Sequence, residues 1–389
     1  MRAVRIEQLR ANHVVARPLL DEDGRVLLNY GVRLTAKYIQ ALKDKGYTHL
    51  YVREEADESV DVAPAEDLDP STRARALRSL RQTFDAVEGE VHHLRAKSLA
   101  AVSDACSSGA MGDLLGNDTT REMMSIVNAI LKEALNHDVL AGLASMEASD
   151  MRLQAHCLDV ATTAIMIGRG VGLHPIRMQQ LAMGCLLHDI GMAFLDSALD
   201  ENTRLRQHAL LGYDLLRNSP NADILAPRIA LEHHERQDGT GVPKGLVGSN
   251  TIERDRTKPP PIPTLIGEIA AVANAYVNLI NGTPSAEPMS SDRALAAIGQ
   301  MRGATFNSEV VRAFFQIAPV YPMASTVVVT SGEFRLYSGT VARVHPDRLD
   351  RPTIVLTKDK VGEPIPPTEI NLKEFPDITI RSRQSDSDL

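Results

Sequence analysis

The stretch His233–Leu246 reads His-His-Glu-Arg-Gln-Asp-Gly-Thr-Gly-Val-Pro-Lys-Gly-Leu. It places two adjacent imidazoles and an acid directly before a glycine-rich turn. A second pair, His188 and Asp189, follows the apolar run Leu181–Leu187. Imidazole nitrogen and carboxylate oxygen together suit borderline cations such as iron, manganese or zinc. The two motifs therefore predict metal-assisted hydrolysis.

Helical periodicity extends on both sides of this stretch, over residues 119–319. Apolar residues recur there at steps of three and four, which predicts an all-α bundle. The expected helices are Met123–Leu143, Leu153–Gly168, Pro175–Leu187, Arg204–Arg217, Ile224–Glu232, Ile266–Ile280 and Arg293–Met301. Asp118, Thr119 or Thr120 is expected to cap the first of them.

The flanking sequence has a different texture. Residues 1–54 contain short β-prone runs and one helical stretch, which predicts a small α/β module. Residues 55–118 begin as an acidic, Pro-containing linker and continue as an amphipathic helix. Residues 320–380 predict a small β-rich extension, and the polar residues 381–389 a disordered tail. The predicted class is mainly α, with a helical bundle between these two smaller parts.

The amphipathic helix over residues 70–105 has two possible roles. Its apolar face can pair with a copy of itself in a homodimer, or it can cover the helical domain. That face is formed by Leu77, Leu80, Phe84, Val87, Val91 and Leu94. His92 and His93 on the same helix imitate a ligand pair, but neither a glycine turn nor an acid follows them. We do not expect these two histidines to bind metal.

Composition excludes other classes of protein. The 389 residues carry a formal net charge of -8 and no Trp, which argues against a nucleic-acid-binding surface. No run approaches the roughly 20 apolar residues of a membrane span, and the N-terminus has charges where a signal peptide has an apolar core. Three scattered cysteines are too few for a disulfide framework. We expect a cytoplasmic protein without a nucleic-acid or membrane partner.

Together, the motifs resemble the HD-GYP family of metal-dependent phosphohydrolases, a branch of the HD superfamily. The resemblance covers about residues 119–319 and depends on four features in order. These are His156 in a helical segment, His188-Asp189-Ile190-Gly191, His208 followed by Gly212, and the run that opens at His233. His137-Asp138 is a His-Asp pair outside this order. The family's usual substrate is the bacterial messenger cyclic di-GMP, so the resemblance implies a phosphodiesterase of that messenger.

The resemblance also implies the metal ligands. They are His156, His188, Asp189, His208, His233, His234 and, as a weaker ligand, Asn274. This set would hold two divalent transition-metal ions, iron or manganese, with positions left for water and a phosphate oxygen. His188 and Asp189, the predicted catalytic pair, are expected about 100° apart on a helix, with the carboxylate bridging both metals. Taken alone, His156 could instead be a hydrogen-bonded core histidine.

Three further residues are candidates for binding the substrate. Arg152 lies one helical turn before the first histidine ligand and can hold a phosphate bidentately, or it can pair with an acid such as Asp150. Gly239 and Gly241 permit a turn that brings backbone N–H groups toward an anion, although a purely structural tight turn explains them equally well. The resemblance implies that the 239–243 turn is also a docking surface for diguanylate cyclase domains.

The sequence departs from the family pattern at the site itself. Val242 stands where the motif has its tyrosine, and Met192 where a lysine ordinarily follows the His-Asp-Ile-Gly run. Arg152 occupies the place of a glutamate found in members with three metals, which favours two. Asn274 and Asn278 stand where the closing helix has aspartates. An asparagine can coordinate through its carbonyl oxygen but brings no charge and takes no proton, so metal affinity should be lower.

These departures leave three functional alternatives. The first is an HD-GYP-type cyclic di-GMP phosphodiesterase with weakened activity. The second is a catalytically degenerate sensor or docking protein that keeps the metal site and binds the nucleotide or a partner. The third is a general nucleotide phosphohydrolase of the wider HD superfamily. The phosphodiesterase is the leading hypothesis, and the losses at Met192, Val242 and Asn274 are the argument for the sensor.

Overall fold

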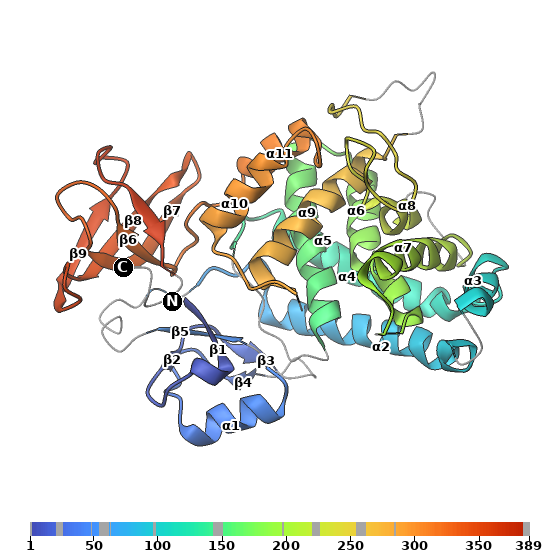
Figure 1. The fold of residues 1–389 in the computed structure, drawn as a ribbon, viewed down its shortest axis with the longest axis horizontal. Coiled ribbons are helices and arrows are strands. Elements are labelled where there is room, and N and C mark those ends of the chain that lie inside the picture. Colours follow the sequence, from blue (N-terminus) through green and yellow to red (C-terminus); the bar gives the residue numbers. More distant parts are fainter. Residues whose placement is uncertain are drawn as a thin grey trace.

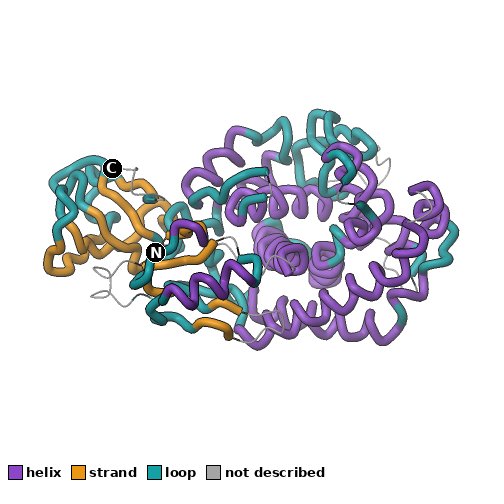
Figure 2. Tube along the Cα trace, turned by 60° about the horizontal axis from the view of Figure 1, so that its bottom comes forward, coloured by secondary structure: helices purple, strands orange, loops and turns teal. Residues whose placement is uncertain are grey.

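The computed structural model of the chain describes residues 2–20, 26–47, 49–53, 62, 64–95, 99–142, 151–196, 198–219, 226–253, 262–283 and 285–383. Within these residues a large helical body lies beside two small strand-rich parts (Figures 1 and 2). Both strand-rich parts lie on the same side of the helical body, the N-terminal one in blue and the C-terminal one in red in Figure 1. The expected class, mainly α with a strand-containing part at each end, is confirmed.

The N-terminal module packs a helix against a small antiparallel sheet of strand order β1-β5-β2, and β3 pairs separately with β4. Its elements are β1 (Arg2–Arg5), η1 (Ile6–Gln8), β2 (Val14–Val15), β3 (Leu19–Leu20), β4 (Val26–Leu28), α1 (Ala36–Asp44) and β5 (His49–Arg53). Thr35 is the N-cap of α1, and its hydroxyl accepts a hydrogen bond from the Tyr38 amide. Alternation along β5 buries Leu50 and Val52 in a core of the module's own.

The helical body carries the main hydrophobic core. Its elements are α2 (Pro70–Arg95), α3 (Leu99–Ser107), η3 (Gly112–Leu115), α4 (Asn117–Ala134), α5 (Arg152–Gly170), α6 (Pro175–Leu186), η5 (Ile190–Phe194), α7 (Glu201–Arg217), α8 (Ala226–Glu232), α9 (Leu265–Asn281), α10 (Ser291–Gln300) and α11 (Ser308–Phe315). Helices α5 and α9 are buried along most of their length and pack on each other in the middle of this body (Figure 1). Polar side chains on the buried faces of these two helices, such as Asn274, therefore lie inside the protein.

The helix α4 differs from its prediction at both ends. Gly116 is its N-cap without a side-chain hydrogen bond, so the expected capping by Asp118, Thr119 or Thr120 is wrong. The helix ends at Ala134 rather than at residue 143. Beyond this end, the Arg169 guanidinium of α5 donates hydrogen bonds to the carbonyl oxygens of Leu135 and Asp138. A tertiary contact thus replaces helical hydrogen bonds that the local sequence would allow.

Helix α2 covers the helical body instead of presenting a free apolar face. Leu77, Leu80, Phe84, Val87 and Val91 are all buried in the main core. Of the two possible roles, covering the helical domain therefore holds at these residues, and a homodimer through the 70–105 helix stays a prediction. The side chains of His92, His93 and Leu94 lie outside the described part.

The C-terminal part is an antiparallel sheet of strand order β10-β6-β7-β8-β9. Its strands are β6 (Thr326–Val329), β7 (Ser338–His345), β8 (Arg348–Lys358), β9 (Pro364–Asn371) and β10 (Ile380–Ser382). Strand β10 continues past residue 381, where the tail was expected to begin, because it pairs with β6 and the Ser382 amide donates to Asp292. Residues 384–389 lie outside the described part.

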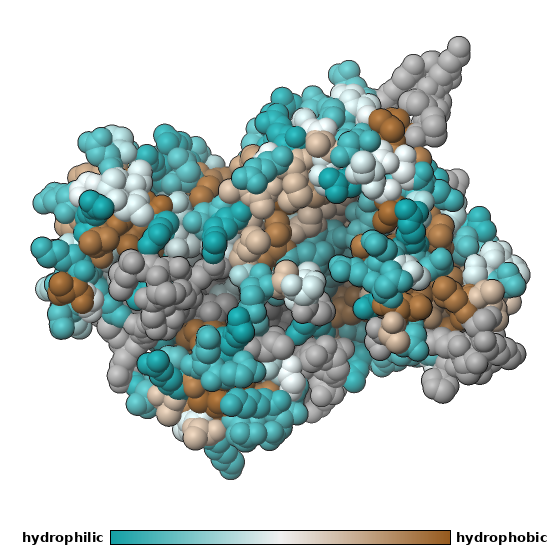
Figure 3. All heavy atoms as spheres, viewed as in Figure 1, coloured by the Kyte–Doolittle hydropathy of each residue, from teal (hydrophilic) through white to brown (hydrophobic). Residues whose placement is uncertain are grey.

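The three parts contact one another. Tyr51 of the module packs against both the module core and the main core, and Ala16 packs with Ala324 near the C-terminal sheet. Arg5 pairs with Glu287 of the α9–α10 connection at 2.8 Å. Among the described helices, none combines the length and apolar character that a bilayer-crossing segment needs. The face in Figure 3 accordingly shows apolar residues in small groups among hydrophilic ones.

Candidate metal centre

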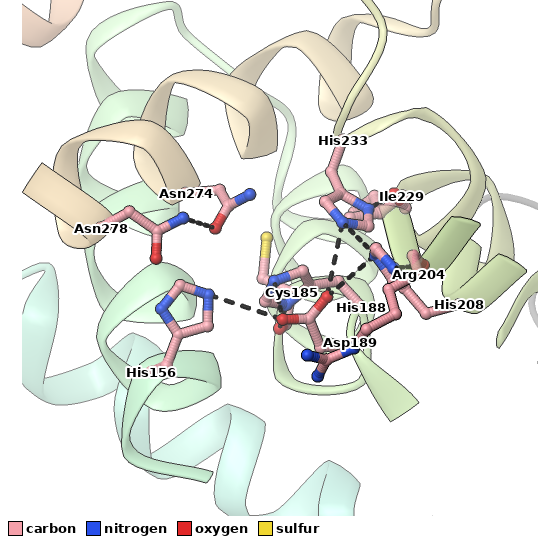
Figure 4. A network of polar contacts seen from close by, with 10 residues as sticks. All are labelled: His156, Cys185, His188, Asp189, Arg204, His208, Ile229, His233, Asn274 and Asn278. Atoms are coloured by element: carbon pink, nitrogen blue, oxygen red, sulfur yellow. Dashed lines mark hydrogen bonds and ion pairs between the residues drawn. The ribbon is translucent and has the colours of Figure 1, made fainter. Parts of the chain in front are cut away.

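Asp189 lies at the centre of the site, and each of its carboxylate oxygens faces two imidazole nitrogens (Figure 4). Oδ2 lies 3.3 Å from His188 Nε2 and 3.7 Å from His156 Nε2. Oδ1 lies 3.3 Å from His208 Nε2 and 3.5 Å from His233 Nε2. The carboxylate therefore divides these four histidines into two pairs, one for each oxygen.

The two sides of Asp189 correspond to two groups of possible metal ligands. One group is His156, His188 and Asp189, and the other is His208, His233 and His234, with the ligand atoms of each group within 4.8 Å of one another. The ring of His234 lies 4.0 Å from that of His233 and 5.0 Å from that of His208, measured between centroids. The structure thus brings all six strong candidates together.

His188 and Asp189 do not lie on a helix, so the expected 100° offset is wrong. Helix α6 ends at Leu186, and the chain turns before η5 begins at Ile190. Asp189 has φ -99° and ψ 11°, a bridge conformation. The turn, not a helical offset, places the carboxylate between the two histidine pairs.

Gly191 explains how this turn comes close to α7. A Cβ atom at Gly191 would overlap the His208 carbonyl oxygen and would lie 2.8 Å from Gly212 N. Glycine permits this approach because it has no side chain. The glycines of the His-Asp-Ile-Gly run and of α7 therefore bring Asp189 within reach of His208.

Backbone carbonyl groups orient three of the imidazoles. Nδ1 of His188 lies 2.7 Å from the Cys185 carbonyl oxygen, and Nδ1 of His208 lies 2.7 Å from that of Arg204. His233 makes the same contact with Ile229 at 3.0 Å. A carbonyl oxygen only accepts, so Nδ1 donates in each case and Nε2 carries the lone pair that points to Asp189.

This arrangement fits a bound cation. His208 Nε2 and His233 Nε2 lie 3.1 Å apart although both nitrogens are acceptors when the imidazoles are neutral. His188 Nε2 is buried and no hydrogen bond is assigned to it within the described residues, although Asp189 Oδ2 lies 3.3 Å away. Metal ions would satisfy these facing lone pairs, and imidazole with carboxylate is the ligand chemistry of divalent transition metals.

The charges of the site favour the same conclusion. Burial lowers the pKa of His156 and that of His208 to about 4, and neighbouring imidazoles add to this although Asp189 opposes it. Burial would raise the pKa of Asp189, but the adjacent imidazoles, His188 foremost, hold it well below its ordinary range. Burial would lower the pKa of His188, but Asp189 and Cys157 raise it well above its ordinary value. At neutral pH His156 and His208 are therefore neutral and Asp189 is ionised, the forms that bind metal.

Asn274 of α9 faces this site, as predicted for the closing helix. Its side chain is 5% exposed and contacts His156, and Asn278 Nδ2 donates to Asn274 Oδ1 at 3.1 Å (Figure 4). A neutral amide thus lies beside the first histidine.

Backbone amides of the glycine-rich run bind a carboxylate of the same chain, that of Glu235. Glu235, which is 4% exposed, accepts the Lys244 amide at 2.6 Å and the Leu246 amide at 2.7 Å. Gly239 has the positive φ of 77° that was expected, whereas Gly241 does not have a positive φ. A Cβ at Gly241 would overlap the backbone of Glu235 and the next residue. A tight turn that closes on Glu235 therefore accounts for the glycines at 239 and 241 without substrate binding by their amides.

Other candidates are placed as follows. Arg152 is exposed at the first residue of α5, where its charge lowers the pKa of His49 after the larger effect of burial. Met192 packs against the main core, and the Val242 amide donates to the His234 carbonyl oxygen. His137 is exposed beyond α4, outside the cluster. Asp150 lies outside the described residues.

Sequence reasoning missed two neighbours of the site. Cys157 follows the first histidine ligand and contacts the His188 ring. Burial raises the pKa of the Cys157 thiol, and the contact with His188 offsets part of this increase. Glu235 was read only as an acid after two histidines, although its position before a glycine-rich run was a signal for a carboxylate that closes the turn. The Cys157 contact had no signal, because it depends on how α5 packs against α6.

Comparison with known proteins agrees with this architecture. Residues 153–279 match the HD domain family. Over 301 residues the chain is 26% identical to the cyclic di-GMP phosphodiesterase PA4108 of Pseudomonas aeruginosa, covering 74% of this chain and 68% of that protein. It is 32% identical over 195 residues to the cyclic di-GMP phosphodiesterase response regulator RpfG of Xanthomonas campestris pv. campestris, covering 47% of this chain and 48% of that protein.

Two further similarities are partial. A cyclic di-GMP phosphodiesterase of Thermotoga maritima is 29% identical over 182 residues, 44% of this chain and 46% of that protein. The matched regions thus span about half the length of the Xanthomonas and Thermotoga proteins. The solved structure of Bd1817, a HDG"Y"P protein from Bdellovibrio bacteriovorus, aligns over 80% of this chain and 97% of that chain with 16% identity and a TM-score of 0.41.

Residues 153–279, the part that matches the HD domain family, contain all six strong candidate ligands. Over this region the chain is similar to the HD domain family, and over longer stretches it is similar to proteins named as cyclic di-GMP phosphodiesterases. The HD domain family binds divalent metals, in agreement with the two ligand groups on either side of Asp189.

Proposed function

We propose that the chain hydrolyses a phosphodiester bond of cyclic di-GMP with two divalent transition-metal ions, iron or manganese. One observation carries the proposal: each oxygen of Asp189 faces two imidazole nitrogens, so that a single carboxylate can serve two ions. When bound, such ions activate a water molecule and neutralise the charge of the phosphodiester. The relatives named for cyclic di-GMP supply the substrate of this proposal.

The residues around Asp189 have separate roles in this proposal. His156 and His188 would hold one ion, and His208 and His233, together with His234, would hold the other. Asn274 is a weak ligand on the side of His156. Five histidines and one carboxylate leave coordination positions open for water and a phosphate oxygen.

Substrate and partner contacts lie at the edge of the site. Arg152 is exposed one turn before His156, where its guanidinium can anchor a phosphate of the nucleotide. The 239–243 turn is half-exposed apart from Thr240, which is exposed, and Glu235 accepts the Lys244 and Leu246 amides directly after it. A partly exposed turn beside the metal centre can dock a diguanylate cyclase domain, so this partner is part of the proposal.

A nucleotide sensor is the second candidate, and Asn274 favours it. With Asp189 as the anionic ligand, two divalent ions of total charge +4 would keep a formal +3. The amide of Asn274 brings no charge, and its oxygen already accepts a hydrogen bond from Asn278. A site of this kind can bind an anionic nucleotide firmly and hydrolyse it slowly.

Metal analysis combined with a turnover assay separates these candidates. We expect two iron or manganese ions per chain and production of linear dinucleotide from cyclic di-GMP in the wild type. His156→Ala should lower both, whereas His137→Ala, which changes an exposed histidine outside the cluster, should lower neither. Two metals with bound nucleotide and no hydrolysis would favour the sensor, and a chain that takes up no metal under reducing conditions would refute both.

A further inference from the structure

Helix α9 carries three asparagines along one face. Asn274, Asn278 and Asn281 are spaced by four and three residues, so they follow one another on the same side of the helix. Asn278 donates to Asn274, and Asn274 contacts His156 of α5. This asparagine stripe, defined by these three residues, therefore begins at the metal centre and leads away from it.

The far end of the asparagine stripe meets a charged pair. Asn281 Nδ2 donates to Asp159 Oδ2 at 3.1 Å, and Arg73 NH1 of α2 donates to Asp159 Oδ1 at 3.0 Å. The side chain of Asp159 is 17% exposed and that of Arg73 is 13% exposed. In a pair with so little solvent contact, removing one partner is costly because it leaves the other charge buried and unpaired.

Asp159 and His156 lie on the same face of α5, three residues apart. Two polar contacts therefore join α5 to α9 on one side: His156 with Asn274 at the metal centre, and Asp159 with Asn281 farther along. Arg73 ties the second contact to α2. A shift of α5 along α9 would break the second contact and move His156 relative to Asp189.

The N-terminal module reaches the same place. Arg17 of the module, Glu66 of the linker, Arg73 and Asp159 line one small cavity with Asn281. Arg17 is buried and held bidentately by Glu66, with Nε 2.8 Å from Oε1. The module and the linker thus contribute charges to the surroundings of Asp159.

We propose that Asp159 is a positioning residue of the metal centre, which holds α5 against α9 and α2 so that His156 stays in reach of Asp189. The charged cavity then makes the position of the N-terminal module and of α2 a determinant of metal affinity. The proposal rests on the proposed function only in requiring that the centre binds metal.

Substitution of Asp159 tests this role in the full-length chain. Asp159→Asn keeps the size of the side chain but removes the charge that Arg73 binds. We expect it to weaken Mn²⁺ binding about tenfold, close to 1.4 kcal/mol, as measured by calorimetric titration of the metal-free protein. Its matched control is Asp214→Asn on α7, the helix of His208. Asp214 is 20% exposed and also lies 3.0 Å from an arginine, but within its own helix, so Mn²⁺ affinity should not change.

A second set of variants keeps the test valid if Asp159→Asn fails to fold. Arg73→Gln should weaken Mn²⁺ binding to a similar extent, and the double variant should bind no more weakly than either single variant, because both changes break one link. The metal-free melting temperatures of variants and control are measured alongside. Wild-type Mn²⁺ affinity in folded Asp159→Asn and Arg73→Gln, or equal losses in Asp214→Asn, would overturn the proposal. If the wild type itself bound no Mn²⁺, the proposed function would fail instead.

Discussion

Restoring a carboxylate at position 274 is the most informative change to the site. Asn274 is 5% exposed, contacts His156 and accepts a hydrogen bond from Asn278. Asn274→Asp adds one negative charge with almost no change in shape. The new carboxylate would keep the Asn278 hydrogen bond through one oxygen and offer the other to a metal on the His156 side.

The size of the effect follows from two opposed contributions. Opposite unit charges about 4 Å apart attract by roughly 4 kcal/mol at an effective dielectric of 20, and each divalent ion doubles the charge on its side. Burying a carboxylate costs several kcal/mol, which cancels most of this gain. We expect a net gain of about 1.4 kcal/mol, which is tenfold in metal affinity. A similar gain in turnover follows if the carboxylate also orients the attacking water.

The assay is Mn²⁺ titration of the metal-free protein, followed by turnover of cyclic di-GMP at saturating metal. Asn136→Asp is the control, because residue 136 is exposed beyond α4 and adds the same charge away from the centre. Higher metal affinity without faster turnover would show that residue 274 limits binding but not hydrolysis, as a sensor requires. No gain in either quantity relative to Asn136→Asp would refute the conclusion that residue 274 takes part in the site.

Four further changes have definite outcomes. Asp189→Asn should release metal from both sides, because each oxygen faces two imidazoles, and metal analysis showing one retained ion would contradict the bridging role. Arg152→Ala should weaken cyclic di-GMP binding by about 1–3 kcal/mol without loss of metal, and unchanged nucleotide affinity would exclude it as an anchor. Glu235→Gln should lower the free energy of unfolding by about 1–3 kcal/mol, since an amide cannot accept both turn N–H groups equally, and an unchanged denaturation midpoint would argue against that reasoning. Burial raises the pKa of Asp67 from 3.8 to about 6, so its stabilising contribution is complete below pH 3.8 and is lost as the pH rises through 6. Asp67→Asn should therefore raise the free energy of unfolding at pH 8 by up to about 3 kcal/mol and leave it unchanged at pH 3.5. Asp104→Asn, which changes an exposed residue, should have no such effect at either pH.

The helical body could be predicted because its apolar residues follow helical periodicity over long segments. The end of α4 could not, because it depends on Arg169, a residue of another helix that binds the carbonyl groups beyond Ala134. Short α11 was also missed, since eight residues give little periodicity. The role of α2 stayed open for a related reason: an apolar face shows that something covers it, but not whether that is the same chain.

At the site, the sequence indicated which residues gather but not how they are oriented. Motif order was enough to select the histidines and Asp189. The turn at Asp189 was predicted as helix, because the apolar run before it gives no sign that α6 ends at Leu186. The closure of the glycine-rich turn by Glu235 depends on hydrogen bonds across nine and eleven residues, which periodicity does not reveal. No sequence pattern indicated a role for Asp159, because its hydrogen-bond partners lie on α2 and α9, far from it along the chain.

Hydrolysis of cyclic di-GMP by the metal-loaded, full-length protein tests the central claim most directly. The amount of linear dinucleotide is measured over time by chromatography, after metal analysis has shown two ions per chain, and Asp189→Asn is run in parallel. The proposed site predicts product that accumulates in proportion to enzyme in the wild type and is absent in Asp189→Asn. A wild type that carries both ions and binds the nucleotide, yet forms no more product than Asp189→Asn, would contradict a phosphodiesterase.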